Sequence, residues 1–339
     1  MLHAGELRLK VVSGGVVPVG FAAAVLVSAC GPAEEPASGE PPPEHAMDAS
    51  ATAGDALPAG VQAISVLGDT LRTAPIGDDA RAAMETDLAA ARADYDAEPT
   101  ADAIIWLGRR SAYLGSYREA IDIYTEGIER FPDDARMYRH RGHRYISTRQ
   151  FDRAIRDFER AASLVEGQPD EVEPDGQPNE RGIPTSTLQS NIFYHLGLAR
   201  YVTGDFEGAL EAYHRCMDVS RNPDMLVATS HWLYMTLRRL ERDDEAARVL
   251  EPITADLDVI ENDSYHQLLL MYKGEVEPGT LWGADDALGN ATVGYGIGNW
   301  HLYNGRRDEA VAAFERVLET GQWASFGYIA AESDLARLR

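Results

Sequence analysis

The amino-acid sequence predicts an all-α fold in which helical hairpins stack side by side as an α-solenoid. The main observation is a pattern of small and aromatic residues that recurs after 34 residues. Its first copy contains Gly108, Ala120 and Tyr124, and its second contains Gly142, Ala154 and Phe158. A second observation is that 45% of the residues are hydrophobic, which is enough for a continuous core. A single hairpin cannot bury its apolar faces alone, so it stacks on copies of itself.

The recurring small residues indicate where two helices of a hairpin cross. Gly108 and Ala120 allow a close approach there, and Tyr124 fills the space beside them. The turns between helices combine glycine, which adopts positive φ, with a short polar residue that can cap the next helix. These turns are Gly115-Ser116, Gly204-Asp205 and Asn304-Gly305.

The recurring pattern resembles the tetratricopeptide repeat, which has a Leu-Gly pair, an aromatic residue, a small residue, a second aromatic residue and a proline. The matching positions of the first copy are Ile104, Leu107, Gly108, Ala120, Tyr124 and Pro132. Those of the second copy are Tyr138, Gly142, Tyr145, Ala154, Phe158 and Ala161. The resemblance implies a right-handed superhelix and a binding surface on its concave side.

The small residue at the helix crossing can be followed along the chain to place the repeats. We expect repeats near residues 101–134, 135–167, 190–223, 227–255, 260–289 and 291–322, with the one at 260–289 degenerate. Residues 168–185 are rich in proline, glycine and acids, so they are expected to form an insertion loop that can fold over the groove. Capping segments are expected at 61–100 and 323–338, the latter as a helix.

The N-terminal residues predict export. Arg8 and Lys10 precede an apolar run at 11–29 that ends at Cys30, and this order is typical of a signal peptide. A cysteine after Val-Ser-Ala resembles the lipobox of bacterial lipoproteins, which implies removal of residues 1–29 and acylation of Cys30. The alternative is an uncleaved membrane anchor, because the run is nearly long enough to span a bilayer.

Residues 30–60 are rich in proline, glycine and glutamate, so they predict a disordered tether between the lipid bilayer and the repeats. These features together predict a lipid-anchored protein of the bacterial cell envelope. Gly31 replaces the aspartate that retains some lipoproteins at the inner membrane, so we expect the outer membrane.

The charge of the chain excludes one class of partner. Its 55 acidic and 31 basic residues give a net charge of −24. Such a surface repels phosphate backbones, so we expect no nucleic-acid partner.

The sequence contains no phosphate-binding glycine loop, zinc-binding helix or nucleophile elbow, so we expect neither an enzyme nor a cofactor. His140 and His143 share a helix face, but the surrounding arginines oppose a metal ion. Cys216 is expected to be buried at a helix crossing rather than to act as a nucleophile with His214.

The candidate binding residues follow the inward-facing stripe of the first helix in each repeat. They are Arg109, Arg136, Arg139, His143, Tyr194, Tyr201, His231 and Arg238. Arginines can clamp a peptide carboxylate with paired hydrogen bonds. The equally weighted alternative is that these arginines pair with acids of the same chain.

The sequence therefore predicts a lipid-anchored scaffold. Its groove is expected to bind a protein or peptide segment that has acidic or carboxylate groups. A second hypothesis is an accessory subunit of a transport or export system that binds a small anion or solute. A third is a hydrolase built on helical repeats, for which no triad or metal set is found.

Overall fold

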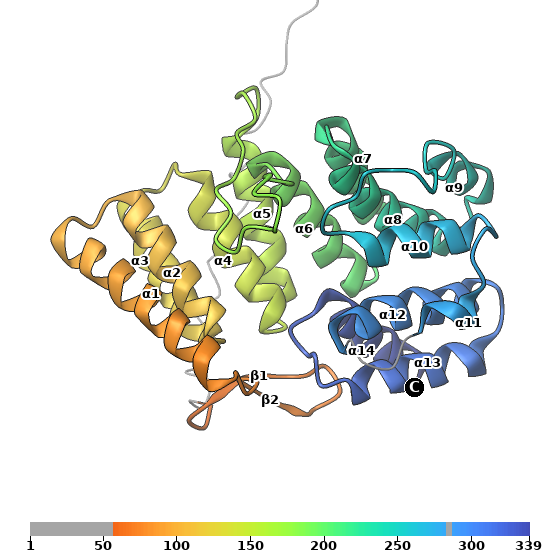
Figure 1. Cartoon of the computed structure of the whole chain (residues 1–339), viewed down its shortest axis with the longest axis horizontal. Helices are drawn as coiled ribbons and strands as arrows, with labels where there is room; N and C mark the ends of the chain where they lie inside the picture. The colour runs from red at the N-terminus through yellow and green to blue at the C-terminus, as the bar shows by residue number, and fades with distance from the viewer. Residues whose placement is uncertain (1–56, 283–286) are drawn as a thin grey trace, which may run out of the picture. The chain divides into compact units, whose positions relative to one another are not determined.

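The computed structural model describes residues 57–282 and 287–339 (Figure 1). The predicted signal peptide at 1–29, Cys30 and most of the predicted tether at 30–60 lie outside the described residues. Two short antiparallel strands, β1 (Val61–Ile64) and β2 (Thr70–Arg72), precede a series of helices. Among the described helices, none is long and apolar enough to cross a membrane.

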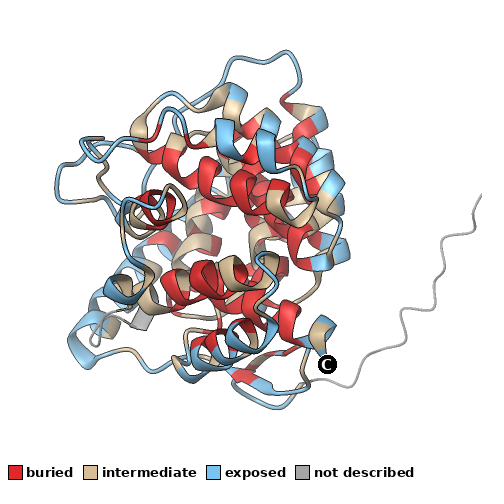
Figure 2. Ribbon diagram, turned by 90° about the vertical axis from the view of Figure 1, so that its right-hand side faces the viewer, coloured by how far each residue is buried: buried red, intermediate tan, exposed pale blue. Residues whose placement is uncertain are grey.

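The helices form hairpins that pack in chain order, which confirms the all-α repeat fold. The first segment is α1 (Asp78–Ala97). It is followed by α2 (Ala101–Tyr113), α3 (Tyr117–Arg130), α4 (Ala135–Ser147), α5 (Phe151–Leu164), α6 (Leu188–Thr203), α7 (Phe206–Val219), α8 (Pro223–Arg239) and α9 (Asp243–Val249). The remaining helices are α10 (Asp263–Tyr272), α11 (Pro278–Leu281), α12 (Ala287–Tyr303), α13 (Arg307–Glu319) and α14 (Phe326–Leu338). Figure 2 shows that buried positions concentrate on helix faces inside this array, while most loop residues are exposed.

Close contact between a glycine and an aromatic ring joins the helices of a hairpin. A Cβ atom added to Gly108 of α2 would lie 2.4 Å from the Tyr124 ring of α3. The same position in the α6–α7 hairpin places Gly197 against Tyr213, where the distance would be 2.6 Å. Side chains larger than hydrogen do not fit there without movement of the ring. This packing explains the recurring glycine and aromatic residue of the sequence pattern.

The insertion loop ends at a well-formed helix start. The Thr187 hydroxyl accepts a hydrogen bond from the Ser190 amide, and the Ser190 hydroxyl accepts one from the Thr187 amide, which forms a capping box for α6. At the other end of α6, Gly204 adopts a φ of 87° and starts the turn to α7. The register of α6 is therefore fixed at both ends by local sequence.

The prediction of a helical cap over residues 61–100 was wrong for its first part. Only α1 is helical, whereas β1 and β2 form a hairpin. Alternate residues of β1, Val61 and Ala63, are buried, which is the period of a strand. The Ser65 hydroxyl accepts the amides of Leu67 and Asp69, and this stabilises the turn between the strands.

The strand hairpin contacts the C-terminal part of the chain. The Val66 amide donates to Oε1 of Glu332 at 2.6 Å, and Nε1 of Trp323 donates to the Arg72 carbonyl at 2.7 Å. Because Glu332 belongs to α14, the two ends of the described helical array meet at this hairpin.

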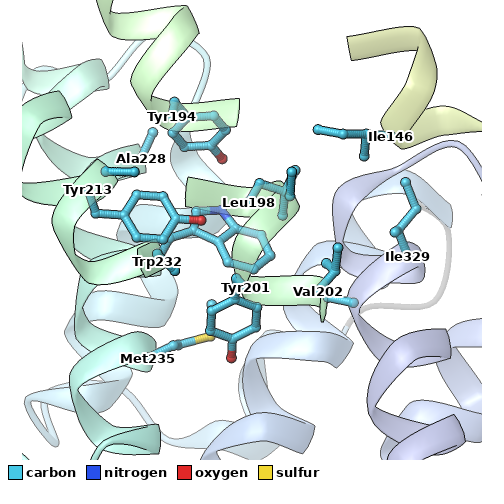
Figure 3. Packing of buried hydrophobic residues seen from close by; sticks show 14 of the residues in the cluster. Ile146, Tyr194, Leu198, Tyr201, Val202, Tyr213, Ala228, Trp232, Met235 and Ile329 are labelled. Atoms are coloured by element: carbon cyan, nitrogen blue, oxygen red, sulfur yellow. The ribbon is translucent and has the colours of Figure 1, made fainter. Parts of the chain in front are cut away.

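Helix α14 also packs on the inner side of the repeats, against α6. Its Ile329 belongs to the same core cluster as Ile146 of α4 and Val202 of α6 (Figure 3). Two buried ion pairs hold the helix there: Arg149 with Glu332 at 2.7 Å, and Arg239 with Asp334 at 3.0 Å. The predicted capping helix therefore covers part of the surface that was expected to form a groove.

Candidate functional site

The eight predicted groove residues fall into two groups by exposure. Arg139, Tyr194, Tyr201 and His231 are buried, whereas Arg109, Arg136, His143 and Arg238 are partly exposed. The first helices of the repeats do direct these side chains inward, but other segments of the same chain cover several of them.

The aromatic positions lie in the core. The Tyr201 hydroxyl is hydrogen-bonded by the Tyr295 hydroxyl of α12 at 2.9 Å. The His231 ring stacks on Tyr265 of α10 with centroids 4.6 Å apart, and neither of its ring nitrogens has a hydrogen-bond partner. Tyr194 is also buried (Figure 3). The expected exposure of these three side chains was wrong, because helices from later in the chain cover them.

Three of the four predicted arginines pair with acids of the same chain: Arg139, whose partner Glu173 is described below, and Arg136 and Arg238. Nη1 of Arg136 lies 2.6 Å from Asp102, and its Nη2 lies 2.5 Å from Asp134. Nε of Arg238 lies 2.7 Å from Asp243. At these positions the structure shows the alternative that the sequence left open.

A polar pocket remains between α2 and α4, with a volume of about 140 Å³. It brings together three predicted residues and several that the prediction missed. Its arginine, histidine and acidic lining residues are Arg109, Arg139, His140, His143, Arg144 and Glu173. His140 and Arg144 are one helical turn apart on α4, so a wider stripe would have included both in the prediction.

The insertion loop covers this pocket. Nε of Arg139 lies 3.0 Å from Oε2 of Glu173, and Nη1 of Arg109 donates to the Pro174 carbonyl at 2.6 Å. Nη1 of Arg110 donates to the Gly176 carbonyl at 3.2 Å. The loop therefore folds over the inner surface, which is one of the arrangements that its sequence allowed.

The histidines of the pocket are neutral at neutral pH. Burial holds the pKa of His140 well below its usual value, and the charge of Arg139 lowers it further. Burial and then Arg144 do the same to the pKa of His143. Arginine stays protonated in proteins, so the pocket carries three positive charges against the one carboxylate of Glu173.

Among the described residues there is neither a metal-binding cluster nor a reactive cysteine. Within the described ranges, no group of three or more His, Cys, Asp or Glu side chains could hold a metal ion. Cys216 is buried, as expected, and burial raises the pKa of its thiol to about 12. A thiol with this pKa is protonated at neutral pH and is not a nucleophile.

Comparisons with known proteins find a tetratricopeptide repeat protein and a co-chaperone among the curated relatives. No family model matches the chain. The small glutamine-rich tetratricopeptide repeat-containing protein 2 of Saccharomyces cerevisiae is 28% identical over 126 residues, which cover 37% of this chain and 30% of that protein. The heat-shock protein cognate co-chaperone sgt12 of Aspergillus fumigatus is 26% identical over 192 residues, covering 56% of this chain and 49% of that protein. The chain thus spans less than half the length of these curated relatives. The first of them supports the tetratricopeptide-type repeat that the sequence predicts.

Solved structures of tetratricopeptide repeat proteins are also similar. One from Parabacteroides merdae has a TM-score of 0.46 and 13% identity, covering 76% of this chain and 94% of that one. YrrB, described as a tetratricopeptide repeat protein with an unusual peptide-binding site, has a TM-score of 0.40 and 16% identity, with coverage of 68% and 92%.

Proposed function

We propose that this protein is a non-enzymatic scaffold that binds an acidic segment of a protein or peptide in the arginine pocket between α2 and α4. The observation that carries the proposal is the charge of this pocket, where Arg109, Arg139 and Arg144 face a single carboxylate. The chain as a whole has a net charge of −24, so the positive charge of the pocket is opposite to that of the rest of the chain.

Such a pocket favours carboxylates for two physical reasons. Guanidinium groups form charge-assisted and often paired hydrogen bonds with carboxylates. Partial burial strengthens these bonds, because the surrounding dielectric is lower than that of water. An acidic segment would be repelled by most of this protein's surface, so the pocket is the place where it can dock.

Removal of two pocket arginines tests the proposal. The double substitution Arg109→Ala and Arg139→Ala should lower partner recovery from envelope extracts at least tenfold. One charge-assisted hydrogen bond contributes about 1.5–3 kcal/mol, and about 1.4 kcal/mol corresponds to a factor of ten in affinity. The measurement is a quantitative pull-down with the full chain as bait.

Arg136→Ala is the matched control, because this arginine lies on α4 but already pairs with Asp102 and Asp134. It should leave recovery unchanged. Equal recovery with the double variant and with wild type, both correctly folded by circular dichroism, would rule out the pocket.

A second candidate function is binding of a small anion for a transport or export system, which the small volume of the pocket favours. Saturable heat on titration with a free carboxylic acid, without any protein partner, would support it. A hydrolase has no such support, since no described histidine hydrogen-bonds a Ser, Thr or Cys side chain.

We also propose that the scaffold is anchored to the bacterial envelope, at the outer membrane, by an acylated Cys30. The support is the signal-like sequence at 1–29 and the tether-like composition of 30–60. Growth with an alkyne-labelled fatty acid should label the wild-type chain and leave Cys30→Ala unlabelled and released from membranes. Labelling that persists in Cys30→Ala would reject the lipoprotein assignment.

A further inference from the structure

The insertion loop presents one carboxylate to the arginine pocket from a fixed position. At its base, Val172 and Thr187 form an isolated antiparallel bridge, and the Leu188 amide donates to the Glu171 carbonyl at 2.8 Å. This base directs Glu173 inward, where its side chain is only 10% exposed. The loop therefore places an acidic side chain where the proposed partner would place its own.

Glu173 is held by polar groups of the pocket. Its Oε2 lies 3.0 Å from Nε of Arg139 and accepts a hydrogen bond from Nδ2 of Asn191 at 3.0 Å. Its Oε1 lies 3.7 Å from Nε2 of His140. These are the contacts that a carboxylate ligand from another molecule would use.

The fit between Glu173 and the pocket is incomplete. Nε of Arg139 is buried without hydrogen-bond geometry to any acceptor, although Glu173 is near. Arg144 has no ion pair among the described residues, and its guanidinium lies 5.0 Å from the centroid of the Tyr117 ring. One carboxylate therefore leaves two of the three guanidinium charges uncompensated in a partly buried place, which is energetically unfavourable.

The rest of the loop is attached mainly by exposed polar contacts. At its far end, Arg181 pairs with Asp258 at 2.7 Å, and both side chains are largely exposed. The apolar side chains of Val172 and Ile183 point to solvent, with 61% and 45% exposure. Exposed ion pairs contribute little, and exposed apolar side chains contribute no burial, so displacement of the loop costs little free energy.

We propose that Glu173 is an internal ligand that occupies the partner's site, and that a segment with two neighbouring carboxylates displaces it together with the loop. This inference rests on the proposed function and names the ligand class of the same pocket. A doubly acidic segment, such as a peptide ending in Asp or Glu, neutralises the three arginines better than Glu173 does. Binding then includes an exchange of one carboxylate for two.

The test measures binding of a fluorescein-labelled hexapeptide with a free C-terminus, Gly-Ser-Ala-Ala-Ala-Glu, to the full chain by fluorescence anisotropy. Glu173→Gln removes the competing charge and keeps the side-chain size, so it should bind the peptide at least tenfold more tightly than wild type. Glu171→Gln is the matched control, because its side chain is exposed on the same loop and outside the pocket. It should bind as wild type does.

A second measurement does not depend on a substitution. Saturating peptide should speed hydrogen exchange at the base of the loop in the wild-type chain, where the Glu173 and Leu188 amides donate to Ser186 and Glu171. Unchanged exchange with bound peptide would overturn the displacement of the loop.

The outcomes separate this inference from the proposed function. If Glu173→Gln binds the peptide no more tightly than wild type while the Arg109→Ala and Arg139→Ala variant loses its partner, the internal-ligand inference fails and the scaffold remains. If the arginine variant keeps its partner, the proposed function itself fails. Succinate binding as tightly as the peptide would overturn the assignment of a peptide ligand.

Discussion

The two halves of the inner surface differ in what covers them. On α2 and α4 the inward positions carry arginines, and a loop with one carboxylate lies over them. On α6 and α8 most of the same positions carry aromatic side chains, which α10, α12 and α14 bury, and Arg238 at the end of α8 is the exception. The comparison teaches that the helical period determines which side chains face inward, while distant segments determine which of them remain accessible.

The difference follows from the chemistry of the side chains. Tyr194 and Tyr201 gain free energy when other apolar groups cover their rings, so helices of the same chain pack over them. The guanidinium groups of Arg109 and Arg139 are stable only where an anion, water or another hydrogen-bond acceptor contacts them. A packed apolar helix cannot supply such groups. A polar loop can cover them and be removed again.

The largest expected effect concerns the buried ion pair that joins α14 to Arg149 in the turn after α4. Glu332→Ala leaves the buried guanidinium of Arg149 unpaired and also removes the acceptor of the Val66 amide. Loss of one partner of a buried ion pair costs about 3–5 kcal/mol. The free energy of unfolding from urea titration should fall by this amount.

The control for this prediction is Asp133→Ala, which breaks the ion pair with Arg160 at an exposed site. Exposed pairs contribute about 0–1 kcal/mol, so this variant should unfold almost as wild type does. A similarly small effect of Glu332→Ala would mean that α14 is not firmly packed on the repeats, and the contrast between the halves would disappear.

The sequence was sufficient to predict those features that depend on residues close together in the chain. The contact of Gly108 with Tyr124 joins helices that are adjacent in the chain, so the pattern predicted the hairpin. The contact of Val66 with Glu332 joins residues 266 positions apart, and no local pattern encodes it. For the same reason, the burial of His231 by Tyr265 could not be predicted, although its inward direction could.

The pocket was predicted only in part for a related reason. Arg109, Arg139 and His143 follow from the helical period, but Arg144 lies just outside the chosen stripe. Glu173 comes from a segment without a helical period, so its place in the pocket depends on the path of the loop. Sequence reasoning could therefore name the basic side of the site and not its acidic component.

The smaller effect tests whether the second half is core or groove. Burial lowers the pKa of His231 from its usual value of 6.5 to about 3. The unfolded chain therefore binds a proton at this residue from pH 6.5 downward while the folded chain does not. The stability that the neutral ring contributes is complete above pH 6.5 and falls progressively as the pH drops toward 3.

His231→Phe removes this dependence, because phenylalanine has no proton to gain and can keep the stacking on Tyr265. Neither ring nitrogen of His231 has a hydrogen-bond partner, so the substitution removes no hydrogen bond. Between pH 7.5 and pH 5.0 the wild type should lose about 2 kcal/mol more stability than the variant, at about 1.4 kcal/mol for each pH unit below 6.5. The measurement is urea unfolding at the two pH values. If both proteins lose the same stability, His231 is open to water in solution, and the second half of the inner surface would be a groove like the first.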